Sequence, residues 1–300
     1  MSNVREVSRL ITAHKQEEGA GFIVRRPLPS MSLAQADPFL LIDEMGPVDY
    51  APGEAVGAPD HPHRGFETIT YVLSGEFEHE DSAGHRGVLR SGDVQWMTAG
   101  AGIVHSEMPS RGVRDAGGRV HGFQIWVNLP AKLKMTQPRY QEVVSAKIPS
   151  AQSSDGLASV RVIAGEALGA RAVIDTLTPV VYQDWSLQPG ADITLPLAAE
   201  QQALLYVFEG AARVGDEGRL VDDGRLAVLS PGDSVRLRAA EGATTPSRML
   251  LLAGVPLNQP VARYGPFVMN TPAEIQEAFR DYQSGKMGEI TRTAQVRATL

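Results

Sequence analysis

The chain has 300 residues, 43% of them hydrophobic, which is enough to bury one large core or two ordinary ones. It contains no cysteine, which excludes disulfides, thiolate metal ligands and a catalytic thiol, and its net charge of -7 without a basic run argues against direct binding to nucleic acid. The N-terminus carries charges where a signal peptide needs an apolar core, and no segment has the roughly 18 apolar residues of a membrane span. We therefore expect a cytoplasmic protein that does not bind membranes.

Short runs of alternating polar and apolar residues, separated by Gly, Pro and Asp, make up most of the chain and predict β-strands. In the run that begins at Glu67, the odd positions as far as Phe77 are mostly apolar and the even ones mostly polar, with Val72 as the exception. We therefore expect a strand whose odd-numbered side chains are buried. Near the end of the chain, a capping-box pattern at Thr271–Glu274 predicts a helix over about 272–284, packed outside a barrel.

Two parts of the chain resemble each other. YVLSG at 71–75 is followed by SGD at 91–93, and YVFEG at 206–210 is followed by PGD at 231–233. The offsets of about 135 and 140 residues predict two copies of one strand-rich unit, with a boundary in the Ser-, Pro- and Gly-containing stretch between Ala146 and Gly156. The predicted fold is thus all-β, with tandem β-barrel domains at 1–145 and 146–300 and a short C-terminal helix in the second.

Two short motifs carry candidate metal ligands. HPH at His61–His63 and HSE at His105–Glu107 each place two such side chains two residues apart, which puts both on one face of a strand. His61 and His63 share the odd parity of the strand after Glu67, provided that no bulge occurs at Gly65. Three imidazoles and a carboxylate inside an apolar barrel are costly unless a divalent cation pairs them. The motifs therefore predict one divalent metal ion per chain.

The repeat provides a control for this interpretation. With the same offsets, the two motifs fall on Pro196, Ala198, Thr245 and Ser247 in the second copy, and no histidine follows His121. A barrel of this design therefore does not need the ligands in order to fold. Without thiolates, the site suits Fe(II), and also Mn(II), Co(II), Ni(II), Cu(II) or zinc.

The other histidines give weaker signals. His79 and His85 lie in the polar segment EHEDSAGHRG and His14 lies in a charged N-terminal segment, so all three are expected at the solvated surface. His121 has the parity of Phe123 and either faces the pocket or lies in the core or at its rim.

The segments HPHRGFETITYVLSG, QWMTAGAGIVHSEMP and HGFQIWVNLP together resemble the pirin family of the cupin superfamily, and DPFLLIDEMGP and GPFVMNT agree with it. The resemblance spans nearly the whole chain. It implies two jelly-roll-like cupin barrels with a single metal, usually iron, in the N-terminal one. It also implies His61, His63, His105 and Glu107 as the ligands.

The carboxylate ligand has two candidates. Cupins in general take a Glu four residues after the second His of the first motif, which is Glu67 here and has the inward parity. The pirin pattern takes the carboxylate from the second motif, at Glu107, and we choose Glu107 because its neighbour His105 is itself a ligand. Glu67 is then expected next to the ligands or as a group that positions the strand.

Resembling bacterial pirins are quercetin 2,3-dioxygenases, in which a flavonol chelates the metal, O2 attacks, the heterocycle opens and CO leaves. The resemblance thus implies an oxidoreductase acting on a small aromatic chelating substrate and O2, with Glu107 as a ligand and as the catalytic base for the substrate hydroxyl. The alternative is a metal-dependent, redox-responsive regulatory protein that acts through a protein partner. The same ligands serve either function.

Overall fold

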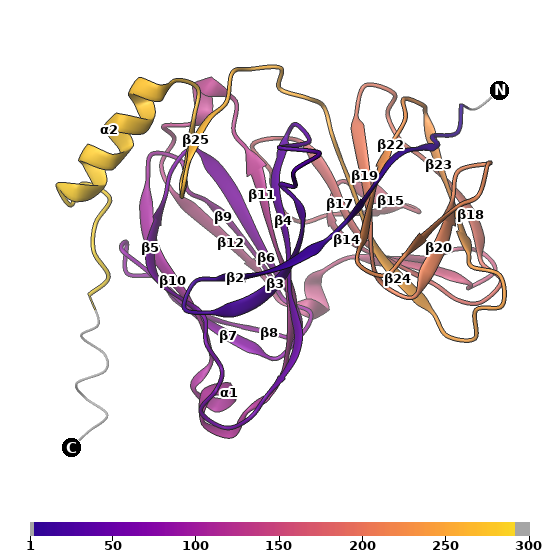
Figure 1. Cartoon of the computed structure of the whole chain (residues 1–300), viewed down its shortest axis with the longest axis horizontal. Coiled ribbons are helices and arrows are strands. Elements are labelled where there is room, and N and C mark those ends of the chain that lie inside the picture. The colour runs from indigo at the N-terminus through magenta and orange to yellow at the C-terminus, as the bar shows by residue number, and fades with distance from the viewer. Residues whose placement is uncertain (1–2, 292–300) are drawn as a thin grey trace. The chain divides into compact units, whose positions relative to one another are not determined.

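The chain forms two antiparallel β-sandwiches of the same design, in each of which a seven-stranded sheet packs against a four-stranded sheet (Figure 1). The structure is a computed structural model and describes residues 3–291. No helix within this part of the chain is long and apolar enough to cross a membrane. The expected all-β fold with two barrels and a C-terminal helix is confirmed.

The strands of the two sheets of the first barrel lie between His14 and Val143. In spatial order, its seven-stranded sheet consists of β12 (Arg139–Val143), β9 (Val94–Thr98), β6 (Phe66–Ser74), β11 (Gly118–Asn128), β4 (Phe39–Tyr50), β3 (Phe22–Leu28) and β2 (His14–Glu18). Its four-stranded sheet consists of β5 (Ala58–His63), β10 (Ile103–Pro109), β7 (Glu76–Asp81) and β8 (Arg86–Arg90). A short helix, α1 (Arg111–Ala116), follows β10.

The second barrel repeats this order. Its seven-stranded sheet consists of β1 (Val7–Thr12), β22 (Arg225–Leu229), β19 (Gln202–Glu209), β24 (Ser247–Gly254), β17 (Val180–Leu187), β14 (Ala158–Ala164) and β13 (Ser150–Gln152). Its four-stranded sheet consists of β18 (Asp192–Pro196), β23 (Ser234–Ala239), β20 (Ala211–Val214) and β21 (Arg219–Asp222). Both sheets contribute to one apolar core that includes Trp185, Leu205 and Leu237.

The internal repeat is confirmed, but the second pair of motifs that aligned the two copies, SGD and PGD, does not precede equivalent strands. The first pair of motifs is equivalent, since YVLSG belongs to β6 and YVFEG to β19, which hold the same place in the two sheets. SGD precedes β9, whose counterpart is β22, whereas PGD precedes β23. The counterpart of the ligand strand β10 is therefore β23, with buried Val235 and Leu237, and not the segment with Thr245 and Ser247. Gly-Asp pairs recur at turns for steric reasons, so the motif alone could not tell the two turns apart.

The N-terminal strand belongs to the second barrel, and the described C-terminal segment belongs to the unit of the first barrel. One compact unit comprises the described parts of Met1–Lys15, Arg25–Asp43 and Val143–Asn258, and the other comprises Gln16–Val24, Glu44–Glu142 and the described part of Gln259–Leu300. The crossing at 142–143 is close to the boundary predicted at 145–146, but the linear division into 1–145 and 146–300 does not hold at either end. The reason is strand pairing. β12 occupies one edge of the first barrel, and the corresponding edge of the second is filled by β1, which pairs with β22.

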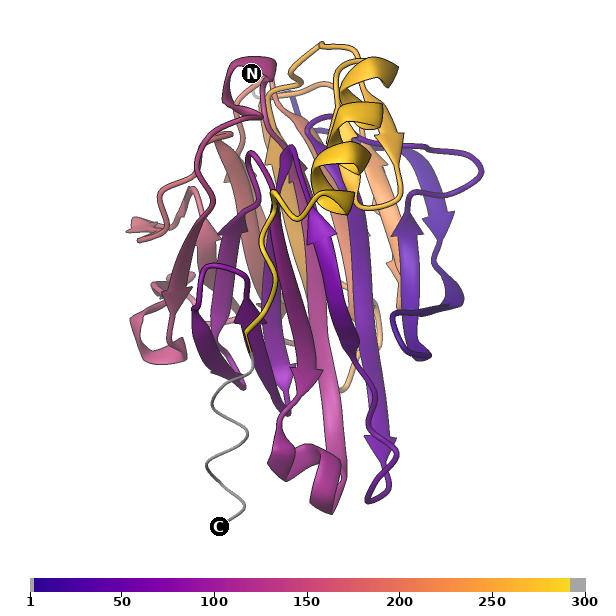
Figure 2. The ribbon, with the colours of Figure 1, turned by 90° about the vertical axis from the view of Figure 1, so that its left-hand side faces the viewer.

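The C-terminal segment is part of the first barrel's unit. It contains the hairpin β25 (Ala262–Tyr264) and β26 (Phe267–Met269) and the helix α2 (Pro272–Gln283), whose capping box at Thr271 and Glu274 is present as expected. Within this unit, both views place α1 and α2 at opposite ends (Figure 1 and Figure 2). Arg64, directly after β5, forms a bridge with Phe267 and an ion pair with Asp281 at 3.0 Å. The C-terminal segment is thereby fixed beside the first ligand motif.

Candidate metal centre

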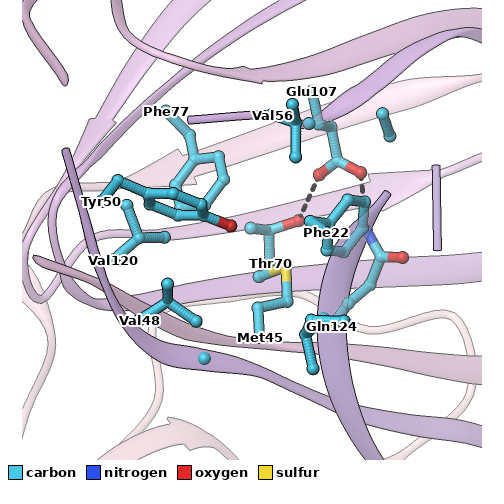
Figure 3. Close-up of a pocket in the computed structure, with 14 residues that line it drawn as sticks. Phe22, Met45, Val48, Tyr50, Val56, Thr70, Phe77, Glu107, Val120 and Gln124 are labelled. Carbon is cyan, nitrogen blue, oxygen red and sulfur yellow. Dashed lines mark hydrogen bonds between the residues drawn. The ribbon is translucent and has the colours of Figure 1, made fainter. Parts of the chain in front are cut away.

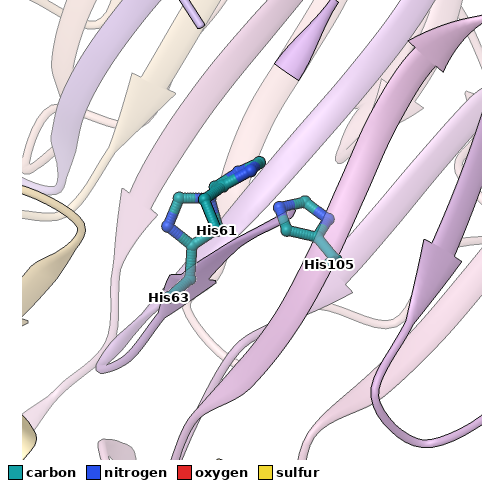
Figure 4. Close-up of side chains that lie close together, drawn as sticks. All are labelled: His61, His63 and His105. Carbon is teal, nitrogen blue, oxygen red and sulfur yellow. The ribbon is translucent and has the colours of Figure 1, made fainter. Parts of the chain in front are cut away.

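Three of the four predicted ligands lie together. β5 and β10 are antiparallel neighbours with His61 directly opposite His105, and directly opposed residues point to the same side of a sheet. His63 follows two residues later on the same face of β5. One donor nitrogen from each ring lies within 4.8 Å of the other two, and the rings converge on a common point (Figure 4).

Burial increases towards the inside of the cluster. The exposed fraction is 3% for His63 and 0% for His105, whereas His61 is half-buried. His61 Nδ1 lies 2.7 Å from the carbonyl oxygen of Pro59, so Nδ1 carries the proton and donates it to that oxygen. Nε2 of His61 is then a lone-pair donor directed at the cluster, 3.1 Å from Nε2 of His63. A backbone carbonyl thus orients the outermost ligand.

The electrostatics of the cluster favour the neutral imidazole, which is the form that binds metal ions. Burial lowers the pKa of both His63 and His105 well below the ordinary value, and the neighbouring His61 lowers both further. Within the described residues, both ring nitrogens of His105 are buried without a hydrogen-bond partner. Such a group costs about 1–3 kcal/mol if nothing satisfies it. A divalent cation bound through the lone pair of one ring nitrogen removes the cost at that atom, so the residues present fit a metal ion.

Glu107, the fourth predicted ligand, is not part of the three-histidine cluster. The extra residue in the pairing of β10 with β5 lies on β5, and β10 pairs with β7 without a shift, so His105 and Glu107 keep one face of β10, but the Glu107 oxygens are not among the clustered donor atoms. The Glu107 carboxylate accepts two hydrogen bonds, one from the Thr70 hydroxyl at 2.7 Å and one from the Gln124 amide at 2.6 Å. These donors come from β6 and β11, across the barrel, and they direct the carboxylate into its interior.

Beside this carboxylate lies an apolar pocket. Its walls include Met45, Tyr50, Phe77 and Val120, and Glu107 extends into it with its two hydrogen-bond donors (Figure 3). The free volume is about 40 Å³. Because drug-sized ligands occupy pockets of roughly 300–1,000 Å³, this space holds small molecules only unless a wall moves.

Glu67 lies on the other face of β6 from the cluster. The Phe66 ring is 5.1 Å from the His63 ring, and Thr70 contacts Glu107, so it is the even positions that face the site. Glu67 accepts a hydrogen bond from Thr98 at 2.7 Å. The expectation of a single buried, odd face was wrong, because β6 is buried on both faces from Phe66 to Val72. The parity was carried across Gly65, whose positive φ of 90° breaks the alternation.

His121 also lies away from the pocket. Its Nε2 is 2.9 Å from a Glu44 carboxylate oxygen, and its ring is 6.0 Å from the Phe123 ring. Phe123 pairs with Tyr71, an odd position of β6, while Gln124, the next residue, is the one that reaches Glu107. Of the two alternatives left open, the structure therefore favours a rim or core histidine.

His79 is the residue that the sequence reading misplaced. Its exposed fraction is 1%, not that of a surface turn, and it lies directly opposite Glu107 in the pairing of β7 with β10. Burial lowers the pKa of His79. The missed signal was the alternation of β7, in which Phe77 and His79 share the buried parity. The surface positions expected for His14 and His85 are confirmed.

Comparisons with known proteins agree on the family. The Pirin family model matches residues 21–127, and the model of the pirin C-terminal cupin domain matches residues 182–288. A pirin-like protein from Solanum lycopersicum is 45% identical over 288 residues, which cover 96% of this chain and 94% of the relative.

Two similar bacterial proteins have an activity in their names. A Pseudomonas aeruginosa protein named provisionally as a quercetin 2,3-dioxygenase is 42% identical over 294 residues, covering 95% of this chain and 99% of that protein. The crystal structure of a quercetin 2,3-dioxygenase from Acinetobacter baumannii superposes with a TM-score of 0.89 at 38% identity, covering 96% of this chain and 100% of that one.

Proposed function

The chain belongs to the pirin family of two-barrel cupins, and on that premise we propose that it is a metal-dependent dioxygenase that opens the heterocycle of quercetin or a similar flavonol with O2 and releases CO. The observation that carries the proposal is that His105 of the three-histidine cluster and Glu107 lie two residues apart on β10, with an apolar pocket beside the carboxylate. The Acinetobacter quercetin 2,3-dioxygenase and the Pseudomonas protein provisionally named as one, which both match nearly the whole chain, support the same activity.

We assign the metal to His61, His63 and His105, with Glu107 as the fourth ligand and iron(II) as the expected ion; manganese, cobalt, nickel, copper and zinc are the alternatives. When bound, such an ion supplies open coordination positions for a chelating enol and O2.

The chain's own residues then prepare the substrate. Thr70 and Gln124 each donate to a different oxygen of Glu107, which fixes the carboxylate and leaves lone pairs free on both oxygens. A carboxylate held in this way is suited to accept the proton of a flavonol hydroxyl at Oε1 or Oε2. Phe77 and Val120 form an apolar wall that excludes water from the place where that proton is transferred.

The small size of the pocket constrains the proposal and favours a second candidate function. A flavonol does not fit into about 40 Å³, so the enzyme must open this pocket to bind one. The segment that we expect to move is the connection at 51–57, because Val56 forms part of the pocket wall. A redox-responsive regulatory protein that acts through a protein partner needs no such opening. The small free volume of the pocket is the observation that favours this second candidate.

The test compares metal content with turnover. We expect purified wild-type protein loaded with iron(II) to consume O2 and release CO with quercetin, and the His63→Ala variant to lose both metal and turnover. The exposed His85 provides a matched control, because His85→Ala removes an imidazole outside the cluster. Full metal content without metal-dependent turnover on a panel of flavonols contradicts the enzyme proposal and favours the regulatory protein.

A second pair of variants identifies the carboxylate ligand. Glu107→Gln is expected to perturb the spectroscopic signal of a bound metal such as cobalt(II), whereas Glu67→Gln, on the other face of β6, leaves it unchanged. A signal perturbed only in Glu67→Gln would assign the carboxylate to Glu67 instead.

A further inference from the structure

The second barrel has a cavity at the end that corresponds to the metal centre of the first. β18 and β23 hold the same places in the second barrel as the ligand strands β5 and β10 in the first. The cavity lies where β18 ends, at Leu195 and Pro196, and just before β23 begins, at Asp233. Its volume is about 750 Å³, well within the range of about 300–1,000 Å³ for small-molecule sites.

The floor of this cavity is apolar, and its one deeply buried polar side chain has hydrogen-bonding capacity left. Trp185, Leu195 and Leu251 are each at most 4% exposed and line the floor. Beside them Gln183, also 4% exposed, accepts from Trp185 Nε1 at 2.8 Å and donates to the Glu166 carbonyl at 2.9 Å. An amide nitrogen has two hydrogens, so Gln183 can still donate one to a ligand.

The rim determines the charge that the cavity accepts. Glu166 and Asp233 are the charged residues of the lining, and no lysine or arginine takes part in it. Carboxylates at the mouth disfavour an anionic ligand, and the apolar floor disfavours any ligand whose charge must be desolvated.

A short hairpin with an apolar tip borders the mouth. It is formed by β15 (Glu166–Ala167) and β16 (Ala170–Arg171), and Leu168 at its tip is 41% exposed. Leu168 has a positive φ of 49°, a conformation that is rare for a residue other than glycine. An apolar side chain held exposed in this way beside a cavity gains contacts when a ligand enters.

We propose that this cavity is a second, metal-free binding site for a neutral, largely apolar ring compound that carries at least one hydrogen-bond acceptor for Gln183. β18 and β23 contain no histidine, and their buried residues Leu195, Val235 and Leu237 are apolar, so the site binds by shape and apolar contact. It does not depend on the chemistry of the metal centre.

The test uses the environment-sensitive dye prodan, a neutral naphthalene with a ketone, and anilinonaphthalene sulfonate as its anionic counterpart. Ala198 lines the mouth and is exposed, so Ala198→Trp narrows the entrance without disturbing the core. Ala199→Trp is the matched control, since Ala199 is the adjacent exposed residue and does not line the cavity. The His63→Ala variant separates this site from the metal centre.

We expect wild type, Ala199→Trp and His63→Ala to bind prodan alike at one molecule per chain, and Ala198→Trp to bind it at least about tenfold more weakly. The sulfonate is expected to bind more weakly than prodan. Unchanged prodan binding in Ala198→Trp, loss of binding in His63→Ala, or tighter binding of the anionic dye would each overturn the proposal.

Discussion

The close approach of the chain at Gly65 links the first ligand motif to the C-terminal segment, and its cost can be worked out from a matched pair of substitutions. Gly65 has φ of 90°, and a Cβ placed there would overlap the carbonyl oxygen of Val268 in β26. Gly84, in the turn between β7 and β8, has φ of 89° with nothing within 4 Å of an added Cβ. The two positions share the backbone cost and differ only in the contact.

The backbone cost of a positive φ is about 1–2 kcal/mol for alanine, and it applies to both Gly65→Ala and Gly84→Ala. At Gly65 the strand β26 must also move, which weakens the hydrogen bond from Lys134 to the Val268 carbonyl, 2.9 Å long in a buried site. Losing a buried hydrogen bond costs about 1–3 kcal/mol. We therefore expect Gly65→Ala to destabilise the protein by about 2–5 kcal/mol and Gly84→Ala by about 1–2 kcal/mol.

The assay is thermal unfolding of the metal-free variants, followed by fluorescence and by hydrogen exchange at Val268. The extra 1–3 kcal/mol corresponds to a melting midpoint roughly 2–12 °C lower for Gly65→Ala than for Gly84→Ala. Faster exchange at Val268 is expected in Gly65→Ala alone. Equal midpoints for the two variants, with unchanged exchange at Val268, would refute the reasoning.

Two further outcomes follow from the same unit. Arg64→Met removes one of the two cations that pair with the Asp281 carboxylate, and Lys286 remains, so we expect a destabilisation of about 1–3 kcal/mol in chemical denaturation. A loss below about 1 kcal/mol would show that the ion pair is dispensable. Val56→Trp fills the pocket beside the Glu107 carboxylate, so flavonol turnover should fall while metal content stays at the wild-type level. Ala83→Trp, at an exposed position outside the pocket and outside the connection 51–57, should leave both unchanged. Turnover retained in Val56→Trp would place the substrate elsewhere.

Much of the site was predictable because metal ligands carry strong local constraints. His61 and His63 lie two residues apart on one strand, and their convergence with His105 follows once β5 and β10 pair. The C-terminal helix was predictable as well, because the capping pattern at Thr271 is local in sequence. Such features depend on a few neighbouring residues only.

What could not be predicted depends on long-range pairing. The positive φ at Gly65 changes which face of β6 is turned towards the site, and the hydrogen bonds that hold the Glu107 carboxylate come from Thr70 and Gln124 on distant strands; neither is visible in the alternation of residue types. β1 pairs with β22 at an edge of the sheet of the second barrel. The residue types of Val7–Thr12 do not indicate which sheet edge this strand joins. His79 was misplaced because its polar neighbours on β7 concealed the buried parity.

The most direct test of the central claim is metal stoichiometry in two variants that remove equally buried imidazoles. His105 belongs to the three-histidine cluster, whereas His79 lies on the adjacent strand β7 outside it, and each is at most 1% exposed. We predict one divalent ion per chain in wild type and in His79→Ala after loading and dialysis, and loss of the ion in His105→Ala. Full occupancy in His105→Ala, or equal loss in both variants, would contradict the assignment of the metal centre.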